Sequence, residues 1–269
     1  MPSPSEDYLA GCRHVLDRVA AQSAHVQQAA EWFAESIHSG RLVHLFGAGH
    51  SRIMVEEMWP RYGSFPGFHP IVELSLTFHN QVAGANGQRQ AMFLETQTGL
   101  AERILRNFHL SSQDTALVVS SSGCNTVPIE MAQLFQAQQI KVVAMVSLAH
   151  CRGSQSKHPH GKKLIDCADL ILDTGAPLGD ALVRVPGLET PVAPASTIGG
   201  CLLINALKAE VAARLVERGE VPNVLTAAAL VGTGRATQLF EAAYDEHGRR
   251  VSQLYQRPEI GRGDAIPGS

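Results

Sequence analysis

The chain has 269 residues, of which 45% are hydrophobic and 17% charged, a composition that excludes wholesale disorder and fits one large folded unit. The 22 Lys and Arg residues are outnumbered by 25 Asp and Glu residues, so the net charge of −3 argues against nucleic acid or an anionic membrane as a partner. No apolar run approaches the ~20 residues that a membrane span needs, and the polar, acidic start of the chain is unlike a signal peptide.

The first part of the chain alternates between helical and strand-like patterns. Residues 6–39 carry apolar side chains at helical spacing, which predicts one long N-terminal helix with Gly40 as its C-cap. A strand-like apolar run follows at residues 42–46, then a short helix at 52–58 and a short strand at 68–72.

The remainder of the chain continues this alternation. The expected elements are a helix at 95–108, a strand at 115–119, a helix at 127–139, strands at 141–146 and 168–172, and a long helix at 196–218. Short, continuous apolar strands that alternate with helices are typical of a parallel sheet buried on both faces. The prediction is therefore a doubly wound α/β fold with a five-stranded parallel sheet and a long N-terminal helix. We expect three parts: residues 1–40 as that helix, 41–235 as the main domain, and 236–269 as a C-terminal helix and flexible tail.

Two predicted strands end in loops that are rich in glycine and small hydroxyl residues. The first strand runs into Gly47, Ala48, Gly49, His50 and Ser51, and the middle strand runs into Ser120, Ser121, Ser122, Gly123, Cys124 and Asn125. In open α/β sheets, ligands bind beyond the carboxyl ends of the strands. Each loop also precedes a helix, whose N-terminal N–H groups favour an anion. These loops indicate a phosphate site built from neutral donors.

A dinucleotide site, a P-loop and a simple helix cap are the alternatives for these two loops. A dinucleotide fingerprint needs a glycine at position 52, where Arg52 stands. The stretch Gly161, Lys162, Lys163 lacks the spacing and hydroxyl residue of a P-loop. The serines could act only as a helix N-cap, but two such loops at strand ends favour a binding site.

The two strand–loop pairs together resemble the sugar isomerase (SIS) domain, a phosphosugar-binding family, over roughly residues 10–235. In that family a serine-rich loop after the middle strand holds the sugar phosphate, and Asn125 stands here where a Thr is more usual. The resemblance implies that the substrate contacts Gly49, Ser51, Ser120, Ser121, Ser122, Gly123 and Asn125. It also implies a homodimer or a larger even oligomer, with the site built across the interface.

Two glutamates narrow the reaction that this resemblance implies. The stretch from Glu57 to Gly63 is similar to the Glu-Cys-Pro-Pro-Thr-Tyr-Gly stretch of N-acetylmuramic acid 6-phosphate etherases, and Glu95 matches their second functional glutamate. The rest of that signature is degraded, and the chain more closely resembles N-acetylglucosamine 6-phosphate dehydratases. Glu57 and Glu95 are therefore the expected acid/base pair. Without the resemblance, Glu57 would fit a solvated helix face and Glu95 a charge at a helix N-terminus.

Paired carboxyl groups suit an elimination across C2–C3 of an open-chain sugar. The C1 aldehyde acidifies the C2 proton, so one ionised glutamate can remove that proton while a protonated one assists the group leaving C3. We expect the assisting carboxyl to have the raised pKa. His50 is the histidine expected to polarise the C1 oxygen, with His79 a weaker candidate; a packing role is the alternative for His50.

Several other residues invite functional interpretations. Glu210 lies in the long C-terminal helix, where SIS isomerases carry a base that moves a proton between C1 and C2, so an isomerase stays an alternative. His158 and His160 lack the helical spacing and the acidic or cysteine neighbours of a metal site, and Cys124 has no adjacent histidine to activate it. We therefore expect no metal and no cofactor.

A third alternative is a non-catalytic sensor of sugar phosphates. Many SIS sensors carry a DNA-binding helix-turn-helix, but the N-terminal segment shows no recognition-helix pattern. Five scattered cysteines without a CxxC pair indicate reduced thiols. The sequence therefore predicts a cytoplasmic phosphosugar enzyme, most simply a dehydratase acting on an aminosugar 6-phosphate, with no nucleic acid or membrane partner.

Overall fold

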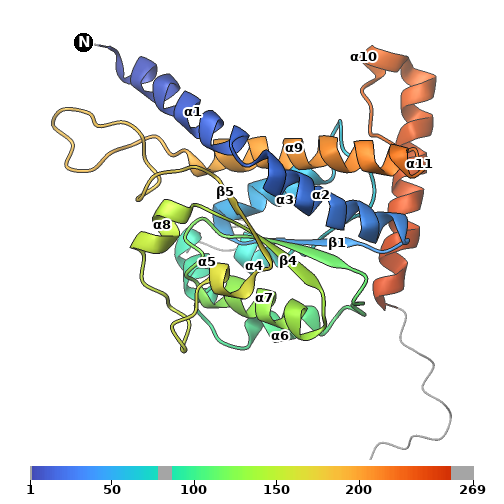
Figure 1. Ribbon diagram of the computed structural model, residues 1–269, viewed down its shortest axis with the longest axis horizontal. Helices are drawn as coiled ribbons and strands as arrows, with labels where there is room; N and C mark the ends of the chain where they lie inside the picture. The colour runs from blue at the N-terminus through green and yellow to red at the C-terminus, as the bar shows by residue number, and fades with distance from the viewer. Residues whose placement is uncertain (1, 78–86, 256–269) are drawn as a thin grey trace, which may run out of the picture.

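A single parallel sheet organises the protein. The computed structural model describes residues 2–77 and 87–255, and its five strands lie in the order β2-β1-β3-β4-β5 (Figure 1). The strands are β1 (Val43–Gly47), β2 (Phe68–Pro70), β3 (Thr115–Val119), β4 (Lys141–Val146) and β5 (Leu170–Asp173). Every neighbouring pair is parallel; Val43 pairs with Thr115, and Thr115 with Lys141. The predicted doubly wound α/β fold with five parallel strands is confirmed.

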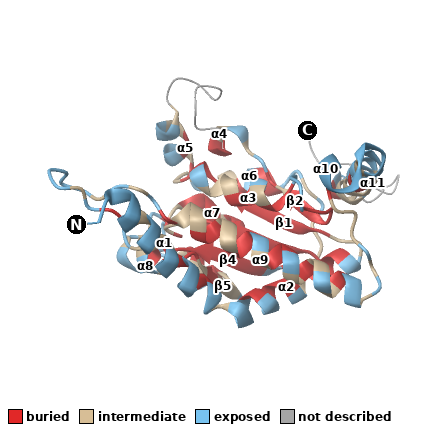
Figure 2. Ribbon diagram, turned by 90° about the horizontal axis from the view of Figure 1, so that it is seen from above, coloured by how far each residue is buried: buried red, intermediate tan, exposed pale blue. Residues whose placement is uncertain are grey.

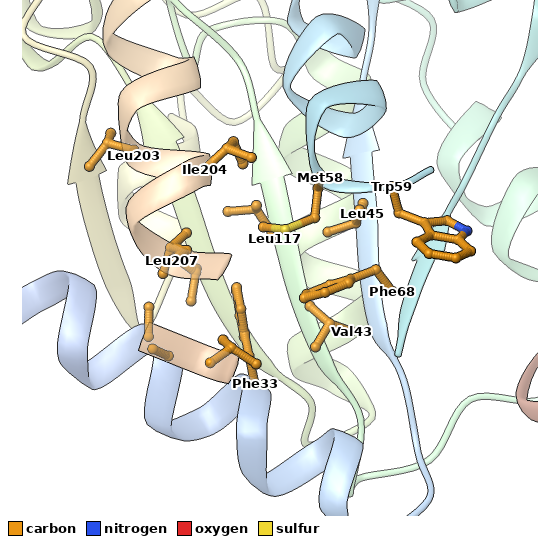
Figure 3. Packing of buried hydrophobic residues seen from close by; sticks show 14 of the residues in the cluster. Phe33, Val43, Leu45, Met58, Trp59, Phe68, Leu117, Leu203, Ile204 and Leu207 are labelled. Carbon is orange, nitrogen blue, oxygen red and sulfur yellow. The ribbon is translucent and has the colours of Figure 1, made fainter. Parts of the chain in front are cut away.

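Alternate side chains of each strand enter two separate hydrophobic layers. On one face, α2 (Ser23–His38), α3 (Arg52–Met58) and α9 (Ser196–Glu217) cover the sheet, and α1 (Pro4–Ala20) continues along α9. Figure 3 shows the centre of this layer, and Figure 2 shows how buried residues concentrate between sheet and helices. Its members include Phe33, Val43, Leu45, Met58, Leu117, Leu203 and Leu207.

The opposite face of the sheet is covered by shorter elements. These are α6 (Leu100–Leu105), α7 (Thr126–Ala137) and the 3-10 turn η3 (Leu164–Cys167). Phe46, Val118 and Ala144 supply strand side chains to this layer, which they share with Phe135 of α7. The short helices α4 (Leu74–Thr77) and α5 (Gln88–Leu94) contact the loop that follows β1, and α8 (Leu148–Gly153) follows β4.

The C-terminal helices extend the β2 edge of the molecule. They are α10 (Ala228–Val231) and α11 (Thr233–Ser252), followed by the turn η4 (Gln253–Tyr255). The ring of Trp59 packs on His247 of α11 at a centroid distance of 5.1 Å, and Arg250 donates a 2.7 Å hydrogen bond to the carbonyl of Ile37. The tail predicted after residue 256 lies outside the described residues.

The N-terminal segment corrects one prediction, because it forms two helices and not one. Ser3 caps α1, which ends at Ala20, and α2 begins at Ser23. The break lies where the side-chain amide of Gln22 meets the edge strand β5. Its Nε2 donates to the carbonyl of Asp173 and its Oε1 accepts from the N–H of Asp173, both at 2.7 Å. Gln22 therefore satisfies backbone groups at a sheet edge, which hydrophobic periodicity does not reveal.

The predicted helix at residues 95–108 is likewise wrong in its boundaries. The structure has α5 ending at Leu94 and α6 beginning at Leu100. Gly99 stands between them with φ +82°, a left-handed conformation that interrupts a helix and favours glycine. Glu95 is consequently the C-cap of α5 rather than the first residue of a helix. An interaction with a helix N-terminus no longer explains this glutamate.

A buried polar network holds the amino-terminal side of the sheet. Arg41 donates to both carboxylate oxygens of Asp114, at 3.0 and 2.9 Å, and the N–H of Leu42 donates to one of them at 3.2 Å. His44 Nε2 lies 3.2 Å from the same carboxylate, and its Nδ1 lies 3.0 Å from Nδ1 of His69. Burial alone would raise the pKa of Asp114, but His44 and Arg41 outweigh it and lower that pKa to about 2. Burial, reinforced by His44, lowers the pKa of His69 to about 3.

These shifts predict that protonation of His69 makes the fold sensitive to acid. Below pH 6.5 the unfolded chain binds a proton at His69, whereas the folded chain does so only near pH 3. The free energy of unfolding therefore decreases as the pH is lowered through this range. His69→Asn keeps an amide that can pair with His44 but removes the titration. The decline in the free energy of unfolding between pH 6.5 and 4.5 should therefore be roughly 2 kcal/mol smaller in this variant than in wild type, measured by urea unfolding.

Titration of Asp114 contributes little to the change in the free energy of unfolding between pH 6.5 and 4.5. Its contribution is fully present above the unfolded pKa of about 3.9 and is lost only as the pH falls toward 2. His14→Asn, on the exposed side of α1, is the matched control and should leave the decline unchanged. An identical pH dependence in wild type and His69→Asn would contradict the assignment.

Candidate functional site

The two glycine- and serine-rich loops lie side by side at the point where the strand order reverses. From β1 the chain crosses to β2 on one side, whereas β3 leads to β4 and β5 on the other. The connections therefore diverge beyond the carboxyl ends of β1 and β3 and leave a crevice there. A Cβ on Gly47 would lie 2.6 Å from the carbonyl oxygen of Ser51, so the tight turn after β1 requires glycine.

Glu95 joins the two loops. Asn125, at the start of α7, donates a short hydrogen bond from its Nδ2 to Glu95 Oε2. On the other side, a Cβ placed on Gly49 would lie 3.4 Å from Glu95 Oε1. The Glu95 carbonyl also accepts a 2.9 Å hydrogen bond from the N–H of Val127. The C-terminal end of α5 is thereby fixed against α7, and the carboxyl group lies between the loops.

Burial sets the protonation behaviour of this carboxyl group. Glu95 is 8% exposed. Burial raises its pKa above the ordinary value, and the hydrogen bond from Asn125 and the charge of Lys157 oppose that rise without cancelling it. A carboxylic acid that stays protonated to higher pH than usual can donate a proton or a hydrogen bond.

The serines of the second loop divide into two kinds. Ser120 Oγ accepts from the N–H of Gly123 at 3.2 Å, and Ser122 Oγ accepts from the N–H of Cys124 at 3.3 Å. These two hydroxyls shape the loop itself. Ser121 Oγ is buried without a hydrogen-bond partner among the described residues, and Ser121 lines a pocket of about 220 Å³. Its hydroxyl is the one available to a ligand.

This pocket crosses the carboxyl edge of the sheet. It is lined by His50, Ser51, Met54, Val119, Ser121, Met145, Thr174, Asp180, Pro194, Ser196 and Thr197. The structure therefore brings three of the predicted residues, His50, Ser51 and Ser121, to one cavity. Gly49, Ser120, Ser122, Gly123 and Asn125 build the loops that border it.

Glu57 lies elsewhere in the protomer. Near the end of α3, its Oε1 accepts from Asn205 at 2.7 Å and its Oε2 accepts from Arg61 at 2.5 Å, while Lys208 donates to its carbonyl at 2.9 Å. Partial burial would raise the pKa of Glu57, but Asn205, Arg61 and the Lys208 charge outweigh it and hold the pKa below its ordinary value. This carboxylate is ionised wherever Glu95 is.

The structure does not bring Glu57 to the serine loop of the same protomer. Glu57 stands six positions after Ser51, an axial rise of ~9 Å on a helix. It lines a separate cavity of about 510 Å³ between α3 and α11, together with Arg61, Tyr62 and Tyr244.

Sequence reasoning missed the far wall of the smaller pocket. Thr174 follows β5, Asp180 lies in the loop after it, and Ser196 begins α9. The strand-end rule that identified the first two loops applies equally to β5 and would have found Thr174. Asp180 is separated from Ser196 by a long irregular segment, so no spacing in the sequence links the two.

The remaining candidates lie apart from this pocket. Glu210 is fourteen residues beyond Ser196 on α9, ~21 Å along the helix axis, and it pairs with Arg214. Within residues 2–77 and 87–255, no group of three or more His, Cys, Asp or Glu side chains is arranged to hold a metal ion. His79 lies outside the described residues.

Comparison with known proteins identifies the family. Residues 7–147, just over half of the chain, match the SIS domain family. A UPF0309 protein of Listeria innocua is 30% identical over 241 residues, covering 90% of this chain and 93% of the relative. A UPF0309 protein of Brucella abortus is 32% identical over 241 residues, covering 90% and 94%. The chain belongs to the SIS domain family, a phosphosugar-binding family, as the sequence predicted.

Solved structures show weaker similarity. The phosphoheptose isomerase GmhA of Neisseria gonorrhoeae aligns with a TM-score of 0.47 at 13% identity, over 77% of this chain and 95% of that one. The Vibrio vulnificus NanR protein complexed with ManNAc-6P aligns with a TM-score of 0.42 at 16% identity, over 88% and 68%. Scores this low indicate nothing about the activity of this chain. None of the helices in the described part of the chain is long and apolar enough to cross a membrane.

The Asn125–Glu95 hydrogen bond gives a direct test of the site geometry. Because this bond favours the charged carboxylate, Asn125→Ala should raise the pKa of Glu95 further above its ordinary value. Carbon-13 NMR of the glutamate side-chain carboxyl groups measures this pKa, with the Glu95 signal assigned by its loss in Glu95→Gln. Asn205→Ala is the matched control: it should raise the pKa of Glu57 and leave that of Glu95 unchanged. An unchanged Glu95 pKa in Asn125→Ala would contradict the contact.

Proposed function

We propose that this protein is a phosphosugar lyase that removes water across C2–C3 of N-acetylglucosamine 6-phosphate. The observation that carries the proposal is the buried carboxyl group of Glu95, held between the glycine loop and the serine loop at the reversal of strand order. A binding protein without catalysis has no need for a buried, hard-to-ionise acid beside its ligand. An elimination needs such a group to protonate the leaving oxygen.

The phosphate is assigned to the serine loop and the start of α7. Among the described residues no side chain caps α7, although the N–H of Val127 is occupied by the Glu95 carbonyl. Because Pro128 has no N–H, the donor that the first turn of α7 can still offer is the N–H of Thr126, and the Ser121 hydroxyl is a second neutral donor. Lys157 adds a positive charge close enough to influence Glu95.

The two glutamates take complementary roles. Glu57, whose pKa is lowered, removes the C2 proton, and the electron pair of that C–H bond forms the C2–C3 double bond as the C3–O bond breaks. Glu95, whose pKa is raised, gives its proton to the departing hydroxyl, which leaves as water. His50 lines the pocket and polarises the C1 oxygen while negative charge develops there.

The proposal requires a dimer. Glu57 lines the cavity between α3 and α11, whereas Glu95 lies between the two loops, so we infer that the site combines Glu95 of one protomer with the Glu57 of a second copy. A groove of about 390 Å³ between α1, α2 and α9, lined by Leu16, Val19 and Leu202, also leaves apolar surface for such a contact.

Incubation of the protein with a panel of hexosamine 6-phosphates, followed by mass measurement, tests the reaction type. Loss of one water from N-acetylglucosamine 6-phosphate is the expected result. Loss of lactate from the N-acetylmuramic acid substrate would instead indicate an etherase, and an unchanged mass with a new retention time an isomerase. If no compound of the panel changes in mass or retention time, the result would contradict catalysis and favour a sensor.

Both glutamates should be required for turnover but not for binding. We expect Glu57→Gln and Glu95→Gln each to lower kcat by roughly 10²–10⁴-fold, the usual span of general acid/base catalysis. Phosphosugar affinity should remain, because the phosphate donors are hydroxyl and amide groups. Glu210→Gln is the matched control and should keep wild-type turnover. Near-wild-type turnover in either variant, with Glu210→Gln inactive, would contradict the lyase and favour the isomerase.

Mixing the two inactive variants tests whether the site is shared between protomers. Random re-association gives mixed dimers in which one site holds both intact glutamates, so activity should return to about a quarter of the wild-type value. Light scattering should show a species of at least twice the 28.9 kDa chain mass. A monomer, or a mixture as inactive as its components, would contradict the shared site.

A further inference from the structure

The far wall of the 220 Å³ pocket is rigidly built from β5 and α9. Thr174 follows β5, and its N–H donates to the carbonyl of Val146 at 2.8 Å. A Cβ on Gly199 would lie 1.8 Å from the carbonyl oxygen of Thr174, so the first turn of α9 can approach only because residue 199 is glycine. A Cβ on Gly200 would likewise lie 2.8 Å from the side chain of Met54. Close packing therefore fixes the position of Thr174 in the pocket.

Thr174 carries a hydroxyl that nothing in the described part of the chain satisfies. The residue is 2% exposed and lines the pocket, and its Oγ1 is buried with no hydrogen-bond partner among those residues. Ser121 Oγ, on the opposite wall, is likewise buried without a hydrogen-bond partner among the described residues. Buried hydroxyl groups nearly always have partners, because leaving one unpaired is unfavourable. Two such groups lining one pocket indicate a polar ligand that contacts both walls.

Asp180 determines what kind of group fits beside Thr174. Its Oδ1 accepts from the N–H groups of Ala195, at 3.1 Å, and Ser196, at 2.7 Å, and its Oδ2 accepts from Ser196 Oγ at 2.5 Å. The positive end of α9 therefore already holds an anion, and a phosphate there would face a carboxylate. A carboxylate offers about four acceptor positions, so one remains after these three bonds. That position accepts a hydroxyl or an amide N–H.

We propose that Thr174 and Asp180 form the subsite for the end of the sugar remote from the phosphate. Thr174 Oγ1 and the remaining acceptor position of Asp180 bind sugar hydroxyl or amide N–H groups, while the serine loop binds the phosphate. The negative charge of Asp180 excludes the phosphate from this end and so fixes the direction in which the substrate lies. This inference rests on the proposed phosphosugar binding but not on the lyase chemistry.

Isothermal titration calorimetry with two probes tests the subsite. The probes are inorganic phosphate and N-acetylglucosaminitol 6-phosphate, which lacks the C1 aldehyde and cannot undergo elimination. Thr174→Val removes the hydroxyl at nearly constant volume. It should weaken alditol phosphate binding roughly tenfold, the scale of one lost hydrogen bond, and leave inorganic phosphate binding and the melting temperature unchanged. Thr174→Ser should restore the affinity, and Thr237→Val, on the exposed side of α11, is the matched control.

Asp180→Asn provides a second, independent variant. It removes the charge but keeps an oxygen that can accept from the start of α9. We expect the preference for the alditol phosphate over inorganic phosphate to fall roughly tenfold or more. Unchanged alditol phosphate affinity in both Thr174→Val and Asp180→Asn would overturn the subsite while leaving the phosphate assignment intact. If wild type binds neither probe, the subsite and the proposed function both fail.

Discussion

The parallel direction of all five strands is the constraint on which the rest of the protein depends. Parallel strands must be connected by crossovers, and here they wind to opposite sides of β1 and β3. The carboxyl ends of all five strands therefore lie at one edge of the sheet, and the diverging connections leave a crevice there that the backbone cannot fill. Glycines at 47 and 199 then bring loop and helix close to the sheet. The pocket is a consequence of the winding, and the side chains determine what it binds.

Burial of Glu95 depends on this arrangement. An isolated carboxyl group in a nearly dry position is costly to ionise. Here that cost is limited by one amide hydrogen bond from Asn125 and a nearby lysine, which moderate the rise in its pKa without abolishing it. Glu57 has the opposite balance, because Asn205, Arg61 and Lys208 all favour its charged form. Two residues of the same type thus acquire opposite tendencies from their surroundings alone, which is the condition for one to act as acid and the other as base.

Much of the fold could be predicted because buried parallel strands leave a plain signal in the sequence. The five strands appear in the sequence as short apolar runs, and the long helix of residues 196–218 appears as a continuous helical pattern. The errors arose where a single polar or glycine residue interrupts a regular pattern. Gln22 ends one helix by bonding to Asp173 of an edge strand, a contact 151 residues away in sequence, and Gly99 separates α5 from α6. The serine loop could be found from its position after β3, but the wall formed by Thr174, Asp180 and Ser196 depends on how α9 packs on β5, which no local spacing encodes.

The proposed direction of substrate binding follows from the distribution of charge around the pocket. The net charge of −3 gives no general attraction for phosphate, so neutral hydroxyl and amide donors must hold it locally. Among the residues that the structure describes, no side chain caps the start of α7, whereas the start of α9 is bound to the Asp180 carboxylate. Two helix N-termini thus face one crevice, and the one at α9 is already occupied by a negative charge. Because a phosphosugar has its charge at one end and its hydroxyl groups along the other, this asymmetry favours one direction of binding. In the proposed orientation the phosphate lies at the serine loop, and the sugar hydroxyl groups lie at the wall formed by Thr174 and Asp180.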